Sequence, residues 1–209
     1  ADTDVERAAD ELSRCRRKVI NADSVERVRG IEGDAATYYF GVFPHLILNQ
    51  KESFVFKGRN RRPPKDAVNA MLSFVYTLIS NDVTAALETV GLDPYVGFMH
   101  ALRPGRPSLA LDIMEELRAY LGDRLVLSLI NRKQITGNQF LQQGDESIIM
   151  TDDARRTIIS AWQARKKEQI QHPFLNEKVS IGLLPHIQAM MLARYLRNDL
   201  DDYPVFLIQ

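Results

Sequence analysis

The stretch PSLALDIMEELRAYLGDRLVLSLIN, residues 107–131, decides the fold class. Its apolar residues recur every four positions, which places them along one stripe of an α-helix. The stripe consists of Leu109, Ile113, Leu117 and Leu121. A long helix with a continuous apolar stripe is typical of a core element, so we expect it to lie within a helical core.

Helical patterns cover most of the remaining sequence. We expect further helices over about 4–18, 23–31, 64–90, 151–169 and 179–197. Pro44 should end or kink the segment that follows the second of these helices, and Gly91 should end the third. The only β signal is a small hairpin over 139–150, around Gly144 and Asp145. The sequence therefore predicts an all-α, multi-helix fold with at most a small β-hairpin.

Composition narrows the setting of the chain. It has 209 residues, 45% of them hydrophobic, and we find no apolar run close to the roughly 20 residues that cross a bilayer. We therefore expect no membrane contact, and the start of the sequence lacks the pattern of a secretory signal, which favours a cytoplasmic location. Cys15 is the only cysteine, so a metal site built on several thiolates is excluded and any metal would need oxygen and nitrogen ligands.

The net charge is zero, from 27 basic and 27 acidic residues, but the charges are unevenly distributed. Basic residues gather in three short stretches: Lys57, Arg59, Arg61, Arg62 and Lys65, then Arg103 and Arg106, then Arg165, Lys166 and Lys167. Such stretches could meet phosphates locally in spite of the neutral total. Taken one at a time, each is more often a solvated surface.

Three places in the sequence carry candidate chemistry. Glu32 lies between two glycines, and His100 precedes an Arg-Pro-Gly-Arg turn. Asp112 and Glu115 are three residues apart, so both project from the same side of the 107–131 helix. Carboxylates with one imidazole suit Mg²⁺ or Mn²⁺. Each residue also has a simpler interpretation, as a solvated carboxylate or a packing histidine, and spacing alone does not exclude it.

Three blocks in order carry a resemblance. They are RGIEGDAATYYF (29–40), KGRNRRPPKDAVNAMLSFVYTLI (57–79) and GFMHALRPGRPSLALDIMEELR (97–118). Together they resemble the helical C-terminal catalytic domain of the CRISPR-associated spacer-acquisition integrases, the Cas-one family. The resemblance is strong over about 20–135 and looser beyond, and no β-rich N-terminal domain of that family is present in the sequence. The chain is thus expected to be a C-terminal part of a longer protein.

The resemblance implies a function and a site. In that family the matching positions bind a divalent metal, Mg²⁺ or Mn²⁺, which here assigns Glu32, His100 and Asp112 as metal-binding and catalytic residues, with Glu115 as a further acidic candidate. The implied reaction joins the 3′-hydroxyl ends of captured DNA to a CRISPR repeat array by transesterification, and water in place of the hydroxyl gives endonuclease activity. The implied partners are double-stranded DNA, a second copy in a homodimer and a small ferredoxin-like adaptation protein. We expect Arg59, Arg61, Arg62, Arg103 and Arg106 to bind the DNA backbone.

On this interpretation residues 1–209 form a single helical catalytic domain of a prokaryotic protein. Its parts would be an entry helix over 1–20, a metal-site core over 21–135, and C-terminal helices with a tail over 136–209. Two alternatives stay open: a non-catalytic helical DNA-binding or scaffold subunit, and a generic metal-dependent nuclease that cuts without joining. Three histidines have no acidic partner at metal-like spacing and are expected to be structural: His45, His172 and His186. Trp162 is expected to be a core residue rather than a base-stacking platform.

Overall fold

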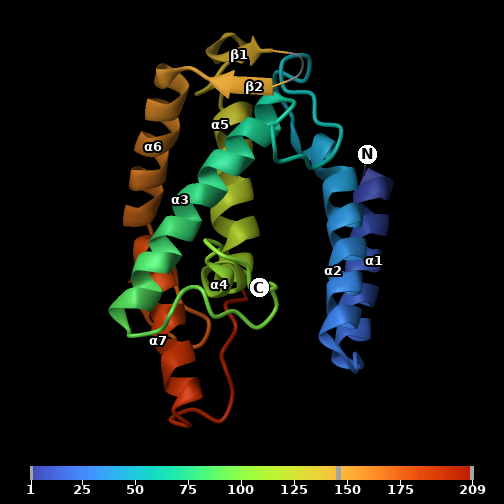
Figure 1. The fold of residues 1–209 in the computed structure, drawn as a ribbon. Coiled ribbons are helices and arrows are strands. Elements are labelled where there is room, and N and C mark those ends of the chain that lie inside the picture. The colour runs from blue at the N-terminus through green and yellow to red at the C-terminus, as the bar shows by residue number, and fades with distance from the viewer. Residues whose placement is uncertain (1, 145–146, 208–209) are drawn as a thin grey trace. The chain divides into compact units, whose positions relative to one another are not determined.

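The computed structural model describes residues 2–144 and 147–207 (Figure 1). The chain groups into two compact units. Unit 1 comprises Ala1–Met71 and Leu127–Thr151, and unit 2 comprises Leu72–Val126 and Asp152–Gln209. The described residues are mainly helical with two small antiparallel hairpins, so the predicted all-α class is confirmed.

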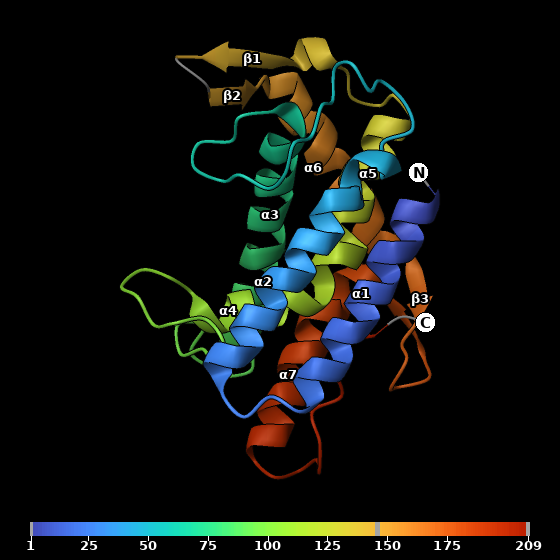
Figure 2. The ribbon, with the colours of Figure 1, turned by 90° about the vertical axis from the view of Figure 1, so that its right-hand side faces the viewer.

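In unit 1 the first two helices pack as a hairpin. Helices α1 (Asp2–Ile20) and α2 (Val25–Val42) lie side by side and antiparallel (Figure 1, Figure 2). Ser24 caps α2, because its Oγ accepts the backbone N–H of Arg27 at 3.3 Å. The expected end of this helix at residue 31 was wrong: α2 continues through its glycines for another eleven residues. A glycine costs a helix only about 1 kcal/mol, which packing against a neighbouring helix offsets.

Pro44 ends α2 as expected, at the start of the short 3₁₀ helix η1 (Phe43–Leu46). Three phenylalanines close the core beneath this junction, with ring centroids 5.1 to 6.0 Å apart: Phe40, Phe43 and Phe56. The predicted hairpin is also confirmed, as β1 (Phe140–Gln143) pairs with β2 (Ser147–Met150) after the 3₁₀ turn η3 (Gly137–Gln139). Gly144 has a φ of 63° at its tip, whereas Asp145 lies outside the described residues.

Helix α3 (Ala67–Thr89) ends as the sequence predicts. Gly91 has a φ of 80°, and the N–H of Leu92 donates to the carbonyl of Leu87 at 2.9 Å, which is a Schellman motif. The helix begins later than the expected Pro64, because Asp66 caps it by accepting the backbone N–H of Asn69 at 2.7 Å.

Residues 107–131, which were expected to form one long helix, are helical with a π-helical interruption. Helix α4 (Ser108–Leu117) runs into a π-helical segment, η2 (Arg118–Asp123), and then into α5 (Arg124–Asn131). All four leucine and isoleucine side chains of the predicted stripe are 5% exposed or less, so the core assignment is confirmed. Within η2, Asp123 accepts the hydroxyl of Tyr76, and the guanidinium of Arg118 lies 5.5 Å from the centre of the same ring.

The C-terminal part of unit 2 contains a hairpin that the sequence patterns missed. Helix α6 (Asp152–Lys167) is followed by the antiparallel strands β3 (Gln169–Gln171) and β4 (Lys178–Ser180). The 3₁₀ turn η4 (Ile181–Leu183) and α7 (Leu184–Leu196) complete the unit, so the last helix begins later than the expected residue 179. Trp162 is 3% exposed on α6 and is a core residue, as predicted.

Among the described residues, one helix is long and apolar enough to cross a membrane by length and composition, which the sequence reading did not anticipate. This helix is α3, and half of its apolar 18-residue stretch is buried inside the protein. A buried core helix has the same properties, so the finding is weak evidence for a membrane span.

Candidate functional site

Asp112, on α4 of unit 2, is the centre of a dense hydrogen-bond cluster. Its Oδ2 accepts the backbone N–H groups of Phe98 at 2.7 Å and Met99 at 3.0 Å. Its Oδ1 accepts the backbone N–H of His100 at 2.9 Å, and the Nδ1 of the same histidine lies 2.7 Å away. The carboxylate is 1% exposed, so it is enclosed by the donors that it binds.

This cluster fixes the loop that carries His100. Three successive backbone N–H groups point at one carboxylate, and the loop is held at a second point because Pro94 accepts the N–H of Leu109 at 2.9 Å. Gly97 makes the close approach possible: a Cβ at this position would lie 2.7 Å from Oδ2 of Asp112 and 2.8 Å from Cβ of Ser108. A side chain there would therefore displace either the carboxylate or the start of α4.

The protonation states follow from the contacts. Burial by itself raises the pKa of Asp112, but the hydrogen bond with His100 and the three backbone N–H groups outweigh it, so this pKa is lowered. An ionised carboxylate only accepts hydrogen bonds, so Nδ1 of His100 carries the proton. In the neutral tautomer with this proton on Nδ1, the lone pair lies on Nε2, in a side chain that is 20% exposed.

Glu115 and Glu116 follow on the same helix in different surroundings. The side chain of Glu115 is 29% exposed and accepts from Nη1 of Arg118 at 2.8 Å. Glu116 points into the protein and binds the C-terminal tail, accepting the hydroxyl of Tyr203 at 2.6 Å and the N–H of Phe206 at 2.9 Å. Burial raises the pKa of Glu116 in spite of these bonds. Glu115 is thus the accessible carboxylate of the pair, and Glu116 is structural.

Glu32 lies in unit 1, on the exposed part of α2. The neighbouring Gly33 is not a point of close packing, because within the described part of unit 1 no atom outside the helix's own backbone comes within 4 Å of a Cβ built there. Within either unit, the described residues hold no group of three His, Cys, Asp or Glu side chains able to bind a metal ion. The structure therefore brings together His100 and Asp112, and the convergence of Glu32 with them stays a prediction.

The predicted DNA-binding arginines differ in their surroundings. Arg59 is part-buried in unit 1, and its Nη1 donates to Oδ1 of Asn69 at 2.6 Å. Asn69 is itself fully buried and also donates to the carbonyl of Gly58 at 2.9 Å, which holds the basic loop in place. The other four divide by unit: Arg61 and Arg62 are exposed in unit 1, and in unit 2 Arg103 is exposed and Arg106 is half-buried. Arg59 is consequently a residue that shapes its loop, whereas the exposed arginines are accessible to a phosphate.

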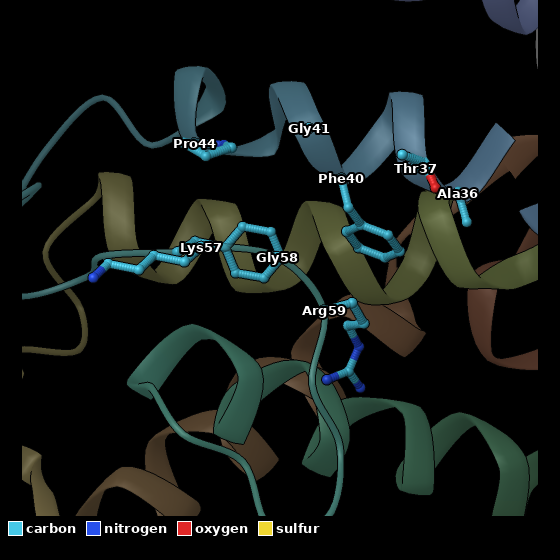
Figure 3. A pocket seen from close by; sticks show the side chains of 9 residues that line it. Ala36, Thr37, Phe40, Gly41, Pro44, Lys57, Gly58 and Arg59 are labelled. Atoms are coloured by element: carbon cyan, nitrogen blue, oxygen red, sulfur yellow. The ribbon is translucent and has the colours of Figure 1, made fainter. Parts of the chain in front are cut away.

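A cavity of about 530 Å³ opens beside Arg59 in unit 1 (Figure 3). Phe40, Gly41 and Pro44 line it from α2 and η1, and the 56–59 segment lines the opposite wall. None of the predicted metal ligands lines this cavity. Its walls are mainly apolar, and the guanidinium of Arg59 is engaged with the loop.

Sequence reasoning missed the roles of Gly97, Asn69 and Glu116. A glycine three residues before His100 could have suggested close approach, but the roles of Asn69 and Glu116 depend on partners that are distant in the sequence. His45 has one distant partner in the sequence that its spacing did not indicate, because its Nε2 lies 3.7 Å from Oδ2 of Asp4 on α1. His172 is fully buried, in agreement with its structural assignment.

Comparison with known proteins supports the resemblance stated above. A protein from Chlorobaculum tepidum, described as "CRISPR-associated endonuclease Cas1 1", is 56% identical over 195 residues, which cover 93% of this chain and 57% of that protein. The chain thus spans little more than half the length of this relative. A solved CAS1 protein from Thermotoga maritima is 31% identical with a TM-score of 0.80, over 90% of this chain and 57% of that one.

A chain of a solved "Cas6-RT-Cas1–Cas2 complex" is 26% identical with a TM-score of 0.86, over 98% of this chain and 22% of that one. The family model described as "CRISPR associated protein Cas1" matches residues 1–164, which include all three blocks and the His100–Asp112 cluster. The chain therefore belongs to the CRISPR-associated Cas1 family.

Proposed function

We propose that this chain is the catalytic part of a divalent-metal-dependent DNA integrase and endonuclease of CRISPR adaptation. The observation that carries the proposal is the contact of His100 with a buried carboxylate, which holds Nδ1 and leaves Nε2 as the ring nitrogen that can bind a ligand, in a side chain that is 20% exposed. Histidines that bind metal commonly have their second nitrogen held by a carboxylate in this way. The names of the relatives, which describe Cas1 endonucleases, support the same activity.

The residues present suit a hard divalent cation such as Mg²⁺ or Mn²⁺. Nε2 of His100 offers one nitrogen ligand. The accessible carboxylate of Glu115, about one turn after Asp112 on α4, offers oxygen ligands. Both oxygens of Asp112 are already occupied by four hydrogen bonds, so we assign this residue to positioning His100 in place of direct coordination. Glu32 is retained as the remaining ligand on the resemblance. When bound, the metal would polarise a phosphoryl oxygen and help to ionise the attacking hydroxyl.

The proposed reaction exchanges one phosphodiester for another. The 3′-oxygen of the incoming DNA end bonds to phosphorus, the bond to the leaving oxygen breaks, and the proton lost by the attacking hydroxyl is balanced by one gained by the leaving group. His100 is suited either to bind the metal through Nε2 or to carry that proton on the same atom. The exposed arginines would hold the backbone without reading sequence. Homodimer formation, a small ferredoxin-like adaptation partner and a cytoplasmic location belong to this proposal as well.

A joining assay tests the proposal. The purified protein and its adaptation partner are incubated with short duplexes bearing free 3′-hydroxyls and a plasmid that carries a repeat, with Mn²⁺ or with EDTA. We expect covalent joining only with metal, and none for His100→Ala, while an exposed-histidine control, His45→Ala, retains it. Cutting without joining would favour a generic nuclease, and metal-independent binding without either reaction would favour a scaffold subunit. Anomalous scattering from Mn²⁺ in crystals then shows whether Glu32, His100 and Glu115 or Asp112 surround the ion.

A further inference from the structure

Two carboxylates on α4, one helical turn apart, each accept hydrogen bonds from a distant part of unit 2. Asp112 accepts three backbone N–H groups of the loop that precedes α4. Glu116 accepts the hydroxyl of Tyr203 at 2.6 Å and the backbone N–H of Phe206 at 2.9 Å. Nε2 of Gln188, on α7, donates to Glu116 as well, at 2.8 Å. Side chains four residues apart lie on the same side of a helix, so α4 is held at two neighbouring points on one side.

The C-terminal tail is docked firmly at the second of these points. Phe206 is the last residue of the segment 203–206, the tail segment, and is 2% exposed. Its ring packs against the rings of Tyr120 and His172, at centroid separations of 5.9 and 5.7 Å. Nε2 of Gln188 also donates to the carbonyl of Pro204 at 3.2 Å. The tail segment therefore connects α4, η2, α7 and the turn between β3 and β4.

The last turn of α4 depends on such contacts, because the regular helix stops directly after Glu116. Helix α4 ends at Leu117 and is followed by the π-helical segment η2. A π-helical segment departs from the hydrogen-bond pattern that keeps an α-helix straight, so the direction of the preceding turn is set largely by its side chains. Glu116 supplies these contacts directly beside Glu115, the accessible carboxylate, and one turn after Asp112.

We propose that the tail segment positions the metal site. Its docking on Glu116 fixes the last turn of α4, and with it the carboxylate of Asp112 and the loop that this carboxylate holds. The consequence for cation affinity rests on the proposed function, whereas the coupling between tail and loop is present without a metal. Tyr203 and Phe206 are positioning residues in this proposal, since they act through α4.

The test measures amide hydrogen exchange, residue by residue, on the protein without metal. In Phe206→Ala we expect the N–H groups of residues 98–100 to exchange at least about tenfold faster than in wild type, because their acceptor is no longer fixed. Tyr203→Phe removes one hydrogen bond and keeps the ring, so the same groups should exchange about 2- to 10-fold faster. Val205→Ala is the matched control, because this tail side chain is 48% exposed, and it should exchange as wild type does.

A second control separates positioning from a general loss of stability. Phe54→Leu removes volume from the core of unit 1, where this side chain is 1% exposed. It should not raise exchange at residues 98–100 above that of other amides. The affinity for Mn²⁺, measured by calorimetry without DNA, should fall at least about threefold in Phe206→Ala and stay unchanged in Val205→Ala.

Three results overturn the inference. In Phe206→Ala, exchange at residues 98–100 could stay at the wild-type rate, or it could rise no more than at amides throughout the chain. The third is an unchanged Mn²⁺ affinity in a variant whose 98–100 amides exchange faster. If the wild-type protein binds no Mn²⁺ but Phe206→Ala still speeds exchange at residues 98–100, the coupling stands and the proposed function alone fails.

Discussion

Nδ1 of His100 lies 2.7 Å from Oδ1 of Asp112, and that oxygen also accepts the backbone N–H of the same histidine. One carboxylate therefore sets both the place of the loop and the direction of the imidazole. This arrangement links folding to chemistry, because any change at Asp112 alters the presentation of Nε2 as well as the stability of the loop.

Replacing Asp112 with Ala should abolish strand joining. The imidazole loses its orienting partner and four donors lose their acceptor, so we also expect the free energy of unfolding to fall by at least about 2 kcal/mol. DNA binding should remain close to wild type, or become slightly tighter, since a negative charge is removed. The measurements are joining, DNA titration and urea unfolding, with Glu88→Gln on the exposed side of α3 as the control. An Asp112→Ala protein that still joins DNA would remove the positioning role.

Glu115→Gln separates coordination from positioning. Its carboxylate is 29% exposed and accepts from Nη1 of Arg118 at 2.8 Å, so we expect the free energy of unfolding to change by less than about 1 kcal/mol. We expect joining to need at least tenfold more Mn²⁺, since loss of a ligand charge weakens metal binding. A metal titration of the joining rate measures this. Unchanged metal dependence here, together with altered dependence in Asp112→Asn, would assign coordination to Asp112 instead.

Arg61 and Arg62 should serve DNA affinity and not chemistry. Replacing both with Ala should weaken duplex binding at all sequences and flatten the log–log salt dependence by about one unit for each lost phosphate contact. The titration is repeated at several salt concentrations. Arg16 and Arg17, exposed on α1, provide a control pair with the same loss of charge. If both double variants lose affinity equally, a general charge effect explains the result and no local contact is required.

The sequence predicted the helical class because apolar residues at helical spacing, such as Ile113 and Leu117, indicate which face of a helix is buried. It also identified His100 and Asp112 as belonging together, through three ordered blocks. It misjudged what depends on tertiary partners. The length of α2 depends on packing against α1. The hairpin of β3 and β4 lies largely between two expected helices, in a stretch to which the periodic patterns assigned no element. The role of Asp112 as an acceptor for a distant loop is not visible in spacing, since spacing shows only that it shares a helix face with Glu115.

Gly97→Ala should damage the site even though this residue has no side chain that takes part in the chemistry. The added Cβ would lie 2.7 Å from both Oδ2 of Asp112 and the backbone carbon of Ser108, and a backbone carbon cannot move without shifting the start of α4. We expect a loss of about 1–3 kcal/mol in stability and a slower joining reaction. Thermal unfolding and joining measure the two effects. Gly41→Ala is the opposite control, because a Cβ there meets no described atom within 4 Å and alanine favours a helix.

His172 should make stability depend on pH below neutrality. The ring is fully buried in unit 2, 5.7 Å from the ring of Phe206, and its Nδ1 accepts the N–H groups of Phe174 at 3.3 Å and Leu175 at 3.2 Å. Burial lowers its pKa, and Gln188 opposes this shift. The unfolded chain therefore binds a proton more readily than the folded one. As the pH falls below the unfolded value of about 6.5, the free energy of unfolding should decrease by up to about 1.4 kcal/mol per pH unit, until the folded histidine is also protonated.

His172→Asn, which keeps an acceptor near the position of Nδ1 but does not titrate, should flatten this dependence between about pH 6.5 and 5, whereas His186→Asn should leave it unchanged. Urea unfolding over this range measures the slopes, and Glu116→Gln is measured alongside because its raised pKa acts with the opposite sign as the pH rises above about 4.5. Equal slopes for wild type and His172→Asn would show that the buried histidine does not control acid stability.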